Sequence, residues 1–595
     1  PGSSSSDADM YSEYRRISEL FRSAFAERLQ KYGDATVSSD STPDLRSAIV
    51  PVSNPEATLP DVVLTRPIGK KSFSRSSELV RVTDLKPEDH QYFRDVMRRT
   101  RMLYDSLRVF TMSEDDKGRD PQLPPQKCRA DLRAAAMMRH SGLWLNRDKR
   151  IVGDIPGIYI GDVFFFRMEL CVFGLHGQVQ AGIDFLPASQ SSNGEPIATS
   201  IIVSGGYEDD DDGGDVILYT GHGGQDKHGR QVVHQKLESG NLALERSMNY
   251  GVEVRVIRGF KYHGGVNGKV YVYDGLYKVI DTWFDVGKAG FGVFKFKLVR
   301  IENQGDMGST VLKFAERLRA HPSEVRPNGY VSFDLSRQKE RVPVLFFNDV
   351  DEDKDPLHYQ YLPATVFPPF VYGGGSKTGC ECLGGCSGYC LCAVKNGGAF
   401  AYDKNGFLVR GKPLIFECGP HCRCPSDCRN RVTQKGIRYR FEVFRSRETS
   451  WGVRSLDLIP AGSFLCEYSG VALTREQAQI FTVNGDTLIY PGRFAERWKE
   501  WGELSQIFSD YVRPSQPSAS PLDFAIDVSK MRNVACYMSH SSVPNVMVQL
   551  VLFDHNNVSF PRLMLFSMEN IPPMRELSLD YGVADEWTGK LAICN

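Results

Sequence analysis

The chain has 595 residues, with 72 basic and 73 acidic side chains and a net charge of −1. That length is too great for one hydrophobic core and predicts roughly three or four domains. The near-zero charge excludes a global basic field, so any affinity for nucleic acid must come from local patches. No apolar run reaches the length of a membrane span, since the richest, 163–175, contains Arg167 and Glu169. We therefore expect no membrane partner.

The first 145 residues are expected to form helices and a linker. Segments 12–31 and 90–107 carry apolar residues at helical spacing. The stretch between them is rich in Ser and Pro and shows no sustained period, so the two helices are expected to pair across a long loop. Packing against the rest of the chain is favoured over binding to a partner, because apolar stripes usually face a core. Residues 129–139 predict a further helix.

Residues 146–303 change to short β-rich runs, such as 163–167 and 252–257, separated by glycine pairs. This texture predicts an all-β or α+β domain with a barrel-like sheet. A linker follows at 304–341, with some helix expected at 310–320.

Nine cysteines lie close together within the next region, 342–435. They are Cys380, Cys382, Cys386, Cys390, Cys392, Cys418, Cys422, Cys424 and Cys428. Three tetrahedral zinc ions need about twelve ligand positions, and nine thiolates supply them if six bind one metal and three bridge two. A disulfide framework is the weaker hypothesis, because it would leave an odd cysteine and require an oxidising compartment. Each metal would be closed by sulfur, so the zinc cluster is expected to be structural.

The last region, 436–583, again predicts short strands, and a tail follows at 584–595. Its motifs are Ser450-Trp451-Gly452-Val453, Cys466-Glu467-Tyr468-Ser469-Gly470, Arg532-Asn533, His540-Ser541, Pro544-Asn545 and Glu576-Leu577-Ser578-Leu579-Asp580-Tyr581-Gly582. They resemble the SET motifs in order. The cysteine spacing resembles the pre-SET motif that precedes histone lysine methyltransferase domains.

A separate resemblance covers the β-rich region. Its motifs are Ser204-Gly205-Gly206-Tyr207-Glu208-Asp209-Asp210, Val216-Ile217-Leu218-Tyr219-Thr220-Gly221 and Tyr273-Asp274-Gly275. They resemble the SRA (YDG) domain, which binds 5-methylcytosine by flipping it into a pocket. Two aromatic faces can offset the lost stacking of a flipped base, and a carboxylate can accept from its exocyclic amine.

The SRA resemblance implies the following DNA-binding residues: Tyr207 and Tyr219 for stacking, Asp210 for the cytosine amine, Gln180 for insertion into the duplex, and Thr220. It implies a second finger at 258–269. Basic residues are expected to be available for phosphates, namely Lys227, Arg230, Lys236, Arg255, Arg258 and Lys261. The other carboxylates of the acidic run 208–212 are interpreted as a solvated loop.

Together these motifs identify the chain as a member of the plant SUVH family. The implied fold class is multidomain, mainly α+β and all-β: an N-terminal helical pair, a barrel-like SRA domain, a three-zinc pre-SET unit and a SET β-fold without a post-SET segment. In active members the SET motifs bind S-adenosylmethionine and thread a lysine through a narrow channel. The resemblance places cofactor-binding residues at Trp451, Gly452, His540 and Asn545, and catalytic residues at Tyr468, His540 and Tyr581.

Several of these SET elements are replaced. The family's Asn-His-Ser-Cys motif reads Ser539-His540-Ser541-Ser542, and Leu579 stands where active enzymes usually carry an aromatic residue. One cysteine, Cys594, follows Tyr581, where the family's post-SET segment would supply three ligands of a fourth zinc. Loss of the fourth zinc together with the post-SET lid that it would hold predicts that the assigned SET residues are vestigial. It also predicts that S-adenosylmethionine does not bind. This pattern resembles the catalytically silent subgroup that acts in RNA-directed DNA methylation.

Three functions are therefore compared. The leading one is a nuclear chromatin protein that reads methylated DNA and recruits silencing-complex proteins, including the plant-specific RNA polymerase machinery. Its rival is an active histone H3 lysine methyltransferase whose lid comes from a partner. A scaffold indifferent to DNA is disfavoured by the pocket residues Tyr207, Asp210 and Tyr219.

Overall fold

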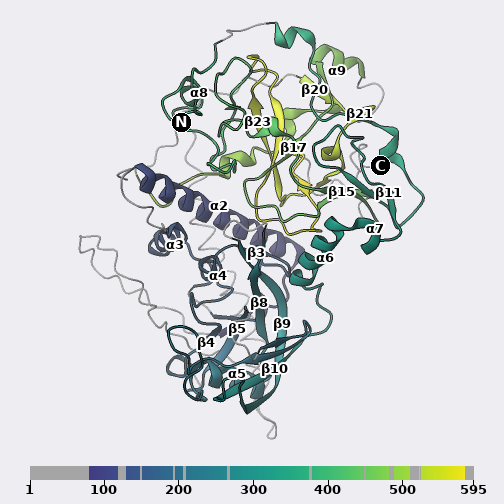
Figure 1. Cartoon of the computed structure of the whole chain (residues 1–595). Coiled ribbons are helices and arrows are strands. Elements are labelled where there is room, and N and C mark those ends of the chain that lie inside the picture. Colours follow the sequence, from purple (N-terminus) through teal and green to yellow (C-terminus); the bar gives the residue numbers. More distant parts are fainter. Residues whose placement is uncertain are drawn as a thin grey trace, which may run out of the picture.

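The computed structural model describes residues 79–582 except 118–128, 148–149, 192–193, 205–209, 264–267, 374–377, 448–449, 482–487, 510–521 and 523. A long helix, α2 (Pro87–Lys117), runs between a lower β-rich body and an upper body that contains the later part of the chain (Figure 1). Proline is favoured at a helix start, and the acidic Glu88 and Asp89 suit the positive end of the helix dipole. The Asp89 carboxylate also accepts a hydrogen bond from the Lys86 N–H at 3.0 Å.

The expected helix at 90–107 is the central part of α2, and the helix expected at 129–139 is α3 (Ala130–His140). Helix α2 buries Phe93, Tyr104 and Leu107 in one core with Ala134 and Met138 of α3. The other expected helix, 12–31, lies outside the described residues, so its pairing with α2 stays a prediction. Among the described elements, α3 covers this part of α2.

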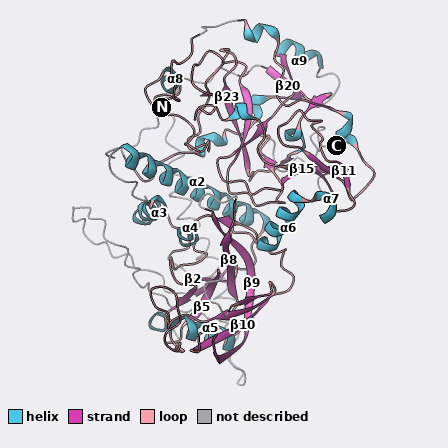
Figure 2. Ribbon diagram, viewed as in Figure 1, coloured by secondary structure: helices cyan, strands magenta, loops and turns pink. Residues whose placement is uncertain are grey.

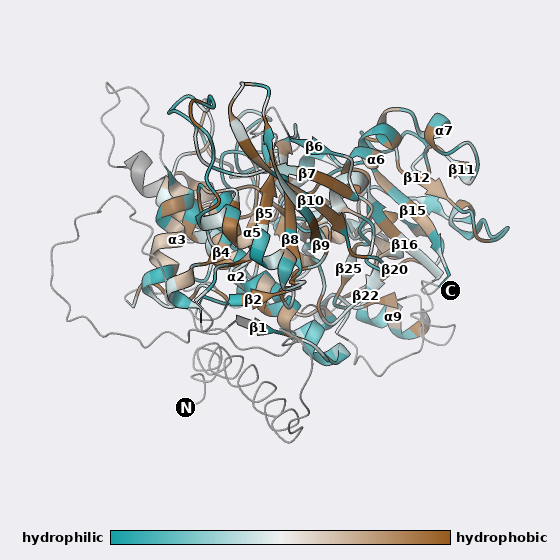
Figure 3. Cartoon of the chain, turned by 90° about the horizontal axis from the view of Figure 1, so that it is seen from below, coloured by the Kyte–Doolittle hydropathy of each residue, from teal (hydrophilic) through white to brown (hydrophobic). Residues whose placement is uncertain are grey.

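The lower body is built on an eight-stranded sheet with the order β4-β5-β8-β9-β10-β7-β6, to which β3 is added against β9. Its strands are β3 (Val163–Phe164), β4 (Ile183–Leu186), β5 (Ile197–Val203), β6 (Asp211–Asp212), β7 (Val216–Thr220), β8 (Val254–Lys261), β9 (Lys269–Val286) and β10 (Gly292–Arg300). Two short helices belong to it, α4 (Arg167–Val172) and α5 (Ser239–Asn249). Strand β5 is buried at every residue, and Figure 3 shows the hydrophobic strands of this sheet gathered at its centre. A strand covered on both faces reads as a continuous apolar run.

A short two-stranded sheet, β1 (Leu79–Arg81) with β2 (Arg150–Val152), lies beside this body. The linker after β10 forms α6 (Gly308–Ala320) and α7 (Pro322–Val325), in agreement with the helix expected at 310–320. Helix α6 begins against the lower body, because a Cβ at Gly308 would lie 2.4 Å from the Gly161 Cα atom. Its Leu312 shares a core with Val272 of β9 and Leu458 of the upper body. The linker is therefore packed between the two bodies.

The upper body combines several small sheets (Figure 2). One contains β11 (Tyr330–Ser332), β12 (Leu345–Phe347), β15 (Phe441–Ser446) and β16 (Ser450–Ser455). A second contains β14 (Ile415–Phe416), β23 (Val546–Leu552), β24 (Arg562–Ser567) and β17 (Phe464–Glu467), and a third contains β18 (Val471–Thr474), β20 (Phe524–Asp527) and β19 (Leu488–Ile489). Two strand pairs are β13 (Gln360–Tyr361) with β21 (Met531–Arg532) and β22 (Ser539–His540) with β25 (Ser578–Leu579); the short helices are α8 (Leu391–Lys395) and α9 (Arg475–Phe481). Strands β12, β13 and β14 come from the segment expected to be the pre-SET unit. They pair with β15, β21 and β23, so this segment contributes strands to the sheets of the last region, 436–583.

Buried charges join the two bodies through α2. The Arg94 guanidinium contacts Asp162 of the lower body at 2.5 Å and Glu569 of the upper body at 2.8 Å. Arg575 contacts Asp162 from the upper side at 2.5 Å. Burial opposes ionisation of Asp162, yet the two guanidiniums hold the pKa of its carboxyl well below the usual range. The junction is therefore a paired charge cluster, in which removing one member would leave the others buried with less compensation.

Across the described residues, no helix combines the length and the apolar character that crossing a membrane requires.

Candidate functional site

The predicted base pocket is anchored at the end of β7. Thr220 is fully buried, and its backbone N–H donates to the Asp210 carboxylate at 2.8 Å. Its hydroxyl oxygen accepts a hydrogen bond at 3.1 Å from the ammonium of Lys295, which lies opposite it on β10. A carboxylate has about four acceptor positions, so Asp210 can accept further donors while it is fixed by Thr220. The structure thus brings together two of the predicted DNA-binding residues, Asp210 and Thr220.

Lys295 was not predicted from the sequence. It is 8% exposed, and burial of an ammonium is costly unless polar groups receive it. The signal for it is the pairing of β10 with β7, which places Lys295 directly across from Thr220. No spacing along the chain reveals that register.

Of the two predicted stacking tyrosines, the structure describes only one. Tyr207 lies outside the described residues, and its role stays a prediction. Tyr219 is 4% exposed and packs with Ile183 and Phe296 in the core of the lower body. Its hydroxyl approaches the loop before β4, because a Cβ at Gly182 would lie 2.6 Å from it. Gln180, the predicted inserting residue, is exposed on that same loop.

The prediction of a phosphate-binding role is wrong for two residues. Arg255 and Arg258 are buried on β8, which is covered on both faces along most of its length. Arg255 donates to the backbone carbonyls of Ile151 and Gly153. Arg258 contacts Asp212 and Asp274 at 2.7 Å each. Asp212 is exposed, as the solvated-loop interpretation expects, but it lies on β6 and not on a loop. Burial opposes its ionisation, yet the paired Arg258 lowers the pKa of its carboxyl.

The other expected phosphate-binding residues are exposed: Lys227, Arg230, Lys236 and Lys261. Lys227 and Arg230 lie on a loop between the bridged residues Gln225 and Gln231, and the Asp226 carboxylate accepts from two backbone N–H groups of that loop. The expected second finger at 258–269 consists of the ends of β8 and β9, with residues 264–267 outside the described part. These exposed cations remain available to a polyanion.

The YDG motif is structural. Asp274 is fully buried and accepts from the backbone N–H of Ser309 at 2.8 Å, besides pairing with Arg258. The Tyr273 hydroxyl donates to Asp154 at 2.6 Å. Gly275 has a φ of +103°, a backbone conformation that strongly favours glycine. The motif therefore ties the sheet to α6 and does not line the pocket.

The nine cysteines gather in the upper body. Thiolates within 4.8 Å of one another form three groups: Cys380, Cys386, Cys392 and Cys418; Cys386, Cys418, Cys424 and Cys428; and Cys382, Cys386 and Cys390. Two sulfurs on one tetrahedral zinc lie about 3.8 Å apart, given Zn–S bonds of about 2.3 Å. The Sγ distances of 3.5 Å for Cys380–Cys386, 3.4 Å for Cys386–Cys418 and 3.6 Å for Cys392–Cys422 are close to that value. The donor set and its spacing fit zinc.

In the SET region, Trp451 is fully buried against Phe346, with the Arg445 guanidinium 4.9 Å from its ring. Its indole N–H has no hydrogen-bond partner among the described residues. A Cβ on Gly452 would lie 2.8 Å from the Phe444 ring and 3.0 Å from a Glu576 carboxylate oxygen. Both residues of the predicted cofactor motif are thus enclosed by the chain itself.

The other two predicted cofactor residues serve the backbone of the SET fold. The Asn545 amide donates to the Glu576 carbonyl at 2.8 Å and accepts from the Ser578 N–H at 2.9 Å. His540 Nδ1 accepts from the Tyr581 N–H at 3.3 Å. These bonds tie residues 540–545 to residues 576–581, beside the parallel pair β22 and β25 in which two distant motifs meet.

The predicted catalytic tyrosines lie together in an aromatic cluster. The ring centroids of Tyr468 and Tyr581 are 6.3 Å apart, and Phe494 lies 5.8 Å from the first and 5.5 Å from the second. All three rings are buried, and the Tyr581 hydroxyl donates to the Met538 carbonyl at 3.0 Å. Leu579 is also buried. The sequence motifs did not reveal Phe494, which comes from a segment between them.

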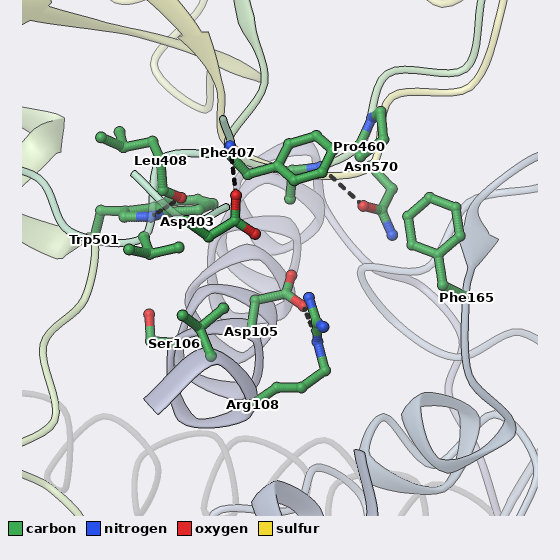
Figure 4. A pocket seen from close by; sticks show the side chains of 13 residues that line it. Asp105, Ser106, Arg108, Phe165, Asp403, Phe407, Leu408, Pro460, Trp501 and Asn570 are labelled. Atoms are coloured by element: carbon green, nitrogen blue, oxygen red, sulfur yellow. Dashed lines mark hydrogen bonds and ion pairs between the residues drawn. The ribbon is translucent and has the colours of Figure 1, made fainter. Parts of the chain in front are cut away.

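A cavity also opens where α2 meets the upper body (Figure 4). Most of its polar groups already serve local bonds: Asp403 accepts from the Phe407 N–H at 2.9 Å, and the Trp501 indole donates to the Leu408 carbonyl at 2.7 Å. Its lining contains none of the predicted pocket, cofactor or catalytic residues. It is a junction cavity, separate from the candidate sites.

Comparison with known families matches three segments of the chain. Residues 151–304 match the SAD/SRA domain, residues 336–431 the Pre-SET motif and residues 450–582 the SET domain. These matches agree with the domain types inferred from the motifs.

Curated relatives and solved structures resemble nearly the whole chain. Two relatives from Arabidopsis thaliana are the histone-lysine N-methyltransferase family members SUVH9, 60% identical over 99% of this chain and 91% of its own, and SUVH2, 57% identical over 100% and 93%. The crystal structure of SUVH9 covers 83% of this chain and 100% of its own, with 62% identity and a TM-score of 0.76. The crystal structure of KRYPTONITE in complex with mCHG DNA and SAH covers 84% and 96%, with 32% identity and a TM-score of 0.66.

Proposed function

The chain belongs to the SUVH family of histone-lysine N-methyltransferase family members, and on this premise we propose that it reads methylated DNA and does not transfer methyl groups. The observation that carries the proposal is the Asp210 carboxylate fixed by Thr220, whose hydroxyl accepts from the buried Lys295. The related KRYPTONITE has been crystallised with mCHG DNA. The proposal extends DNA binding of that kind to this protein.

Base reading follows from the chemistry of the pocket. Asp210 accepts a hydrogen bond from the exocyclic amine of cytosine, a donor that thymine lacks. Thr220 fixes the carboxylate, so little ordering is left for the moment of binding. Tyr207 and Tyr219 supply aromatic surface for the flipped base, whose extraction from the duplex costs a few kcal/mol. Gln180 fills the position that the base leaves, and the exposed Lys227 and Arg230 contact phosphates.

The cysteine unit holds three zinc ions in this proposal. Cys386 belongs to all three thiolate groups and Cys418 to two, which would suit them as bridging ligands. Cys380 would be the third, since its sulfur lies 3.5 Å from that of Cys386 and its backbone N–H donates to the Cys422 sulfur at 3.5 Å. The remaining thiolates then form the pairs Cys382 with Cys390, Cys392 with Cys422, and Cys424 with Cys428. The zinc ions stabilise the fold, because each is closed by sulfur. The unit positions the SET sheets through β14.

In this proposal the SET region is an interaction surface for partner proteins and not a catalyst. Lysine methylation requires a cofactor and an amine held in line, and catalysis of this kind is sensitive to displacements of about 1 Å. Here Phe494 packs against both tyrosines, and Asn545 and His540 are engaged by the backbone. Ser539 and Leu579 are further departures from active members. The protein would then recruit the RNA-directed DNA methylation machinery to methylated loci in nuclear chromatin.

A direct test compares Asp210→Asn with Asp211→Asn in the full chain. The two substitutions remove the same charge from adjacent residues, but Asp211 is exposed and only Asp210 holds Thr220. Asp210→Asn should lower affinity for a methylated duplex by about tenfold or more, since a good base contact is worth about 1–3 kcal/mol. Asp211→Asn should leave affinity unchanged or slightly raised. Equal behaviour of the two variants in fluorescence anisotropy would disprove the pocket.

A further inference from the structure

One arginine bonds to the backbone of the loop that carries Gln180. Arg167 lies at the start of α4, ten residues or more before the loop in sequence. Its guanidinium donates to the Gln180 carbonyl at 2.5 Å and to the Ala181 carbonyl at 3.1 Å. A planar guanidinium presents its donors in a rigid fork, so two neighbouring carbonyls are fixed at once. The loop backbone is therefore fixed at these two carbonyls while Gln180 itself stays exposed.

His176 adds a third donor to the same loop. Its Nε2 lies 3.0 Å from the Ala181 carbonyl, which can only accept, so Nε2 carries the proton. Its Nδ1 then accepts from the Ser200 hydroxyl at 2.8 Å. Burial lowers the pKa of His176 to about 4, so the ring is neutral at physiological pH and keeps this arrangement.

The two ends of the loop are also fixed. The Gly177 N–H donates to the Asp184 carboxylate at 2.8 Å, and the Gly182 carbonyl accepts from the Ile202 N–H at 2.7 Å. Gly182 also lies against the Tyr219 hydroxyl. The loop and the side of the pocket formed by Tyr219 are thus one connected unit.

We propose that Arg167 is a positioning residue for methylated-DNA reading: with His176, it holds the 177–182 loop in the shape that presents Gln180 to the duplex. This rests on the proposed function. A loop held in its bound shape loses less conformational freedom on binding, and that raises affinity without a new contact to DNA. Arg167 acts through Gln180, and it makes no phosphate contact of its own.

The test is a double-mutant cycle in the full chain with Arg167→Met, Gln180→Ala and both together. Each single variant should bind a methylated duplex about tenfold more weakly, and the double variant should be no weaker than either, because both remove the same inserted side chain. Arg167→Lys should recover only part of the loss, since a lysine cannot span two carbonyls in a fixed fork. Losses that multiply would overturn the proposal.

Salt dependence separates positioning from charge. A phosphate contact would lower the slope of log affinity against log salt by about one when it is removed. Arg167→Met should leave that slope unchanged, and a slope lower by about one would contradict the proposal. Lys278→Met is the matched control, because Lys278 is an exposed cation of the same domain, on β9. Its variant should not couple to Gln180→Ala.

A measurement without DNA distinguishes failure of this inference from failure of the proposed function. Hydrogen exchange of backbone amides in 177–182 should speed up severalfold in Arg167→Met and stay unchanged in Lys278→Met. If the parent protein fails to prefer methylated duplex, the proposed function falls, while this exchange result still decides whether Arg167 holds the loop. Unchanged exchange in Arg167→Met would overturn the positioning role whatever the DNA result.

Discussion

The base pocket and the SET site use their polar atoms in opposite ways. In the lower body, Thr220 at the end of β7 donates to the Asp210 carboxylate and accepts from Lys295, and we propose that Asp210 there receives a base. In the upper body, Asn545 and His540 bond to the chain's own backbone. Phe494 packs against both predicted catalytic tyrosines there. The same fold can therefore present its side chains to a ligand or engage them in its own backbone, and function must be judged from the site and not from the fold.

The largest expected effect comes from the zinc cluster, whose loss should distinguish the stability of the upper body from that of the lower body. Cys386→Ser should release zinc and unfold the cysteine unit, because Cys386 belongs to every thiolate group and structural zinc is worth about 10–16 kcal/mol in small domains. The melting temperature of the upper body should fall by more than about 10 °C. Elemental analysis of the parent should give three zinc ions per chain, and one or four would contradict the assignment.

The control for this experiment is Cys171→Ser, which changes a buried cysteine in the lower body. Its zinc content should equal that of the parent. If Cys386→Ser also kept its full zinc content, the bridging role of this residue would be wrong.

A smaller effect is expected from disrupting the charge cluster that joins the two bodies. Arg94→Met leaves Asp162 and Glu569 buried with less compensation, and breaking a buried ion pair costs about 3–5 kcal/mol. The free energy of unfolding, measured by denaturant titration, should fall by about that amount. Arg99→Met on the same helix removes a partly exposed pair with Asp95 and should change it by about 0.5 kcal/mol or less. Similar losses in the two variants would show that the junction cluster does not join the bodies.

The smallest effect concerns pH. The pKa of His176 is lowered by burial from 6.5 to about 4, so between these values the unfolded chain binds more protons than the folded one. Stability should therefore fall as pH drops from about 6.5 to 4, by up to roughly 3 kcal/mol from this residue. His176→Gln should flatten the dependence in that window. An unchanged slope in the variant would show that another group causes it.

Local patterns predicted much of this structure. Cysteine spacing indicated the zinc cluster, and helical periodicity located α2, α3 and α6. The failures concern long-range packing. Arg255 and Arg258 resembled exposed cations because nothing in the sequence shows that β8 is covered on both faces.

Residues that act across the fold were also missed. Lys295 reaches Thr220 through the register of two strands, and Phe494 reaches Tyr468 and Tyr581 from a segment between the motifs. Such contacts depend on how strands pair in space, which spacing along a chain does not encode.

The most direct test of the central claim is a calorimetric titration of the full chain with S-adenosylmethionine, run beside an active SUVH family member and followed by a methylated duplex in the same cell. We predict no saturable heat for the cofactor and a saturable heat for the duplex. Cofactor binding near one molecule per chain, together with methyl transfer to histone that is lost in Tyr581→Phe, would contradict the account and establish the enzyme instead.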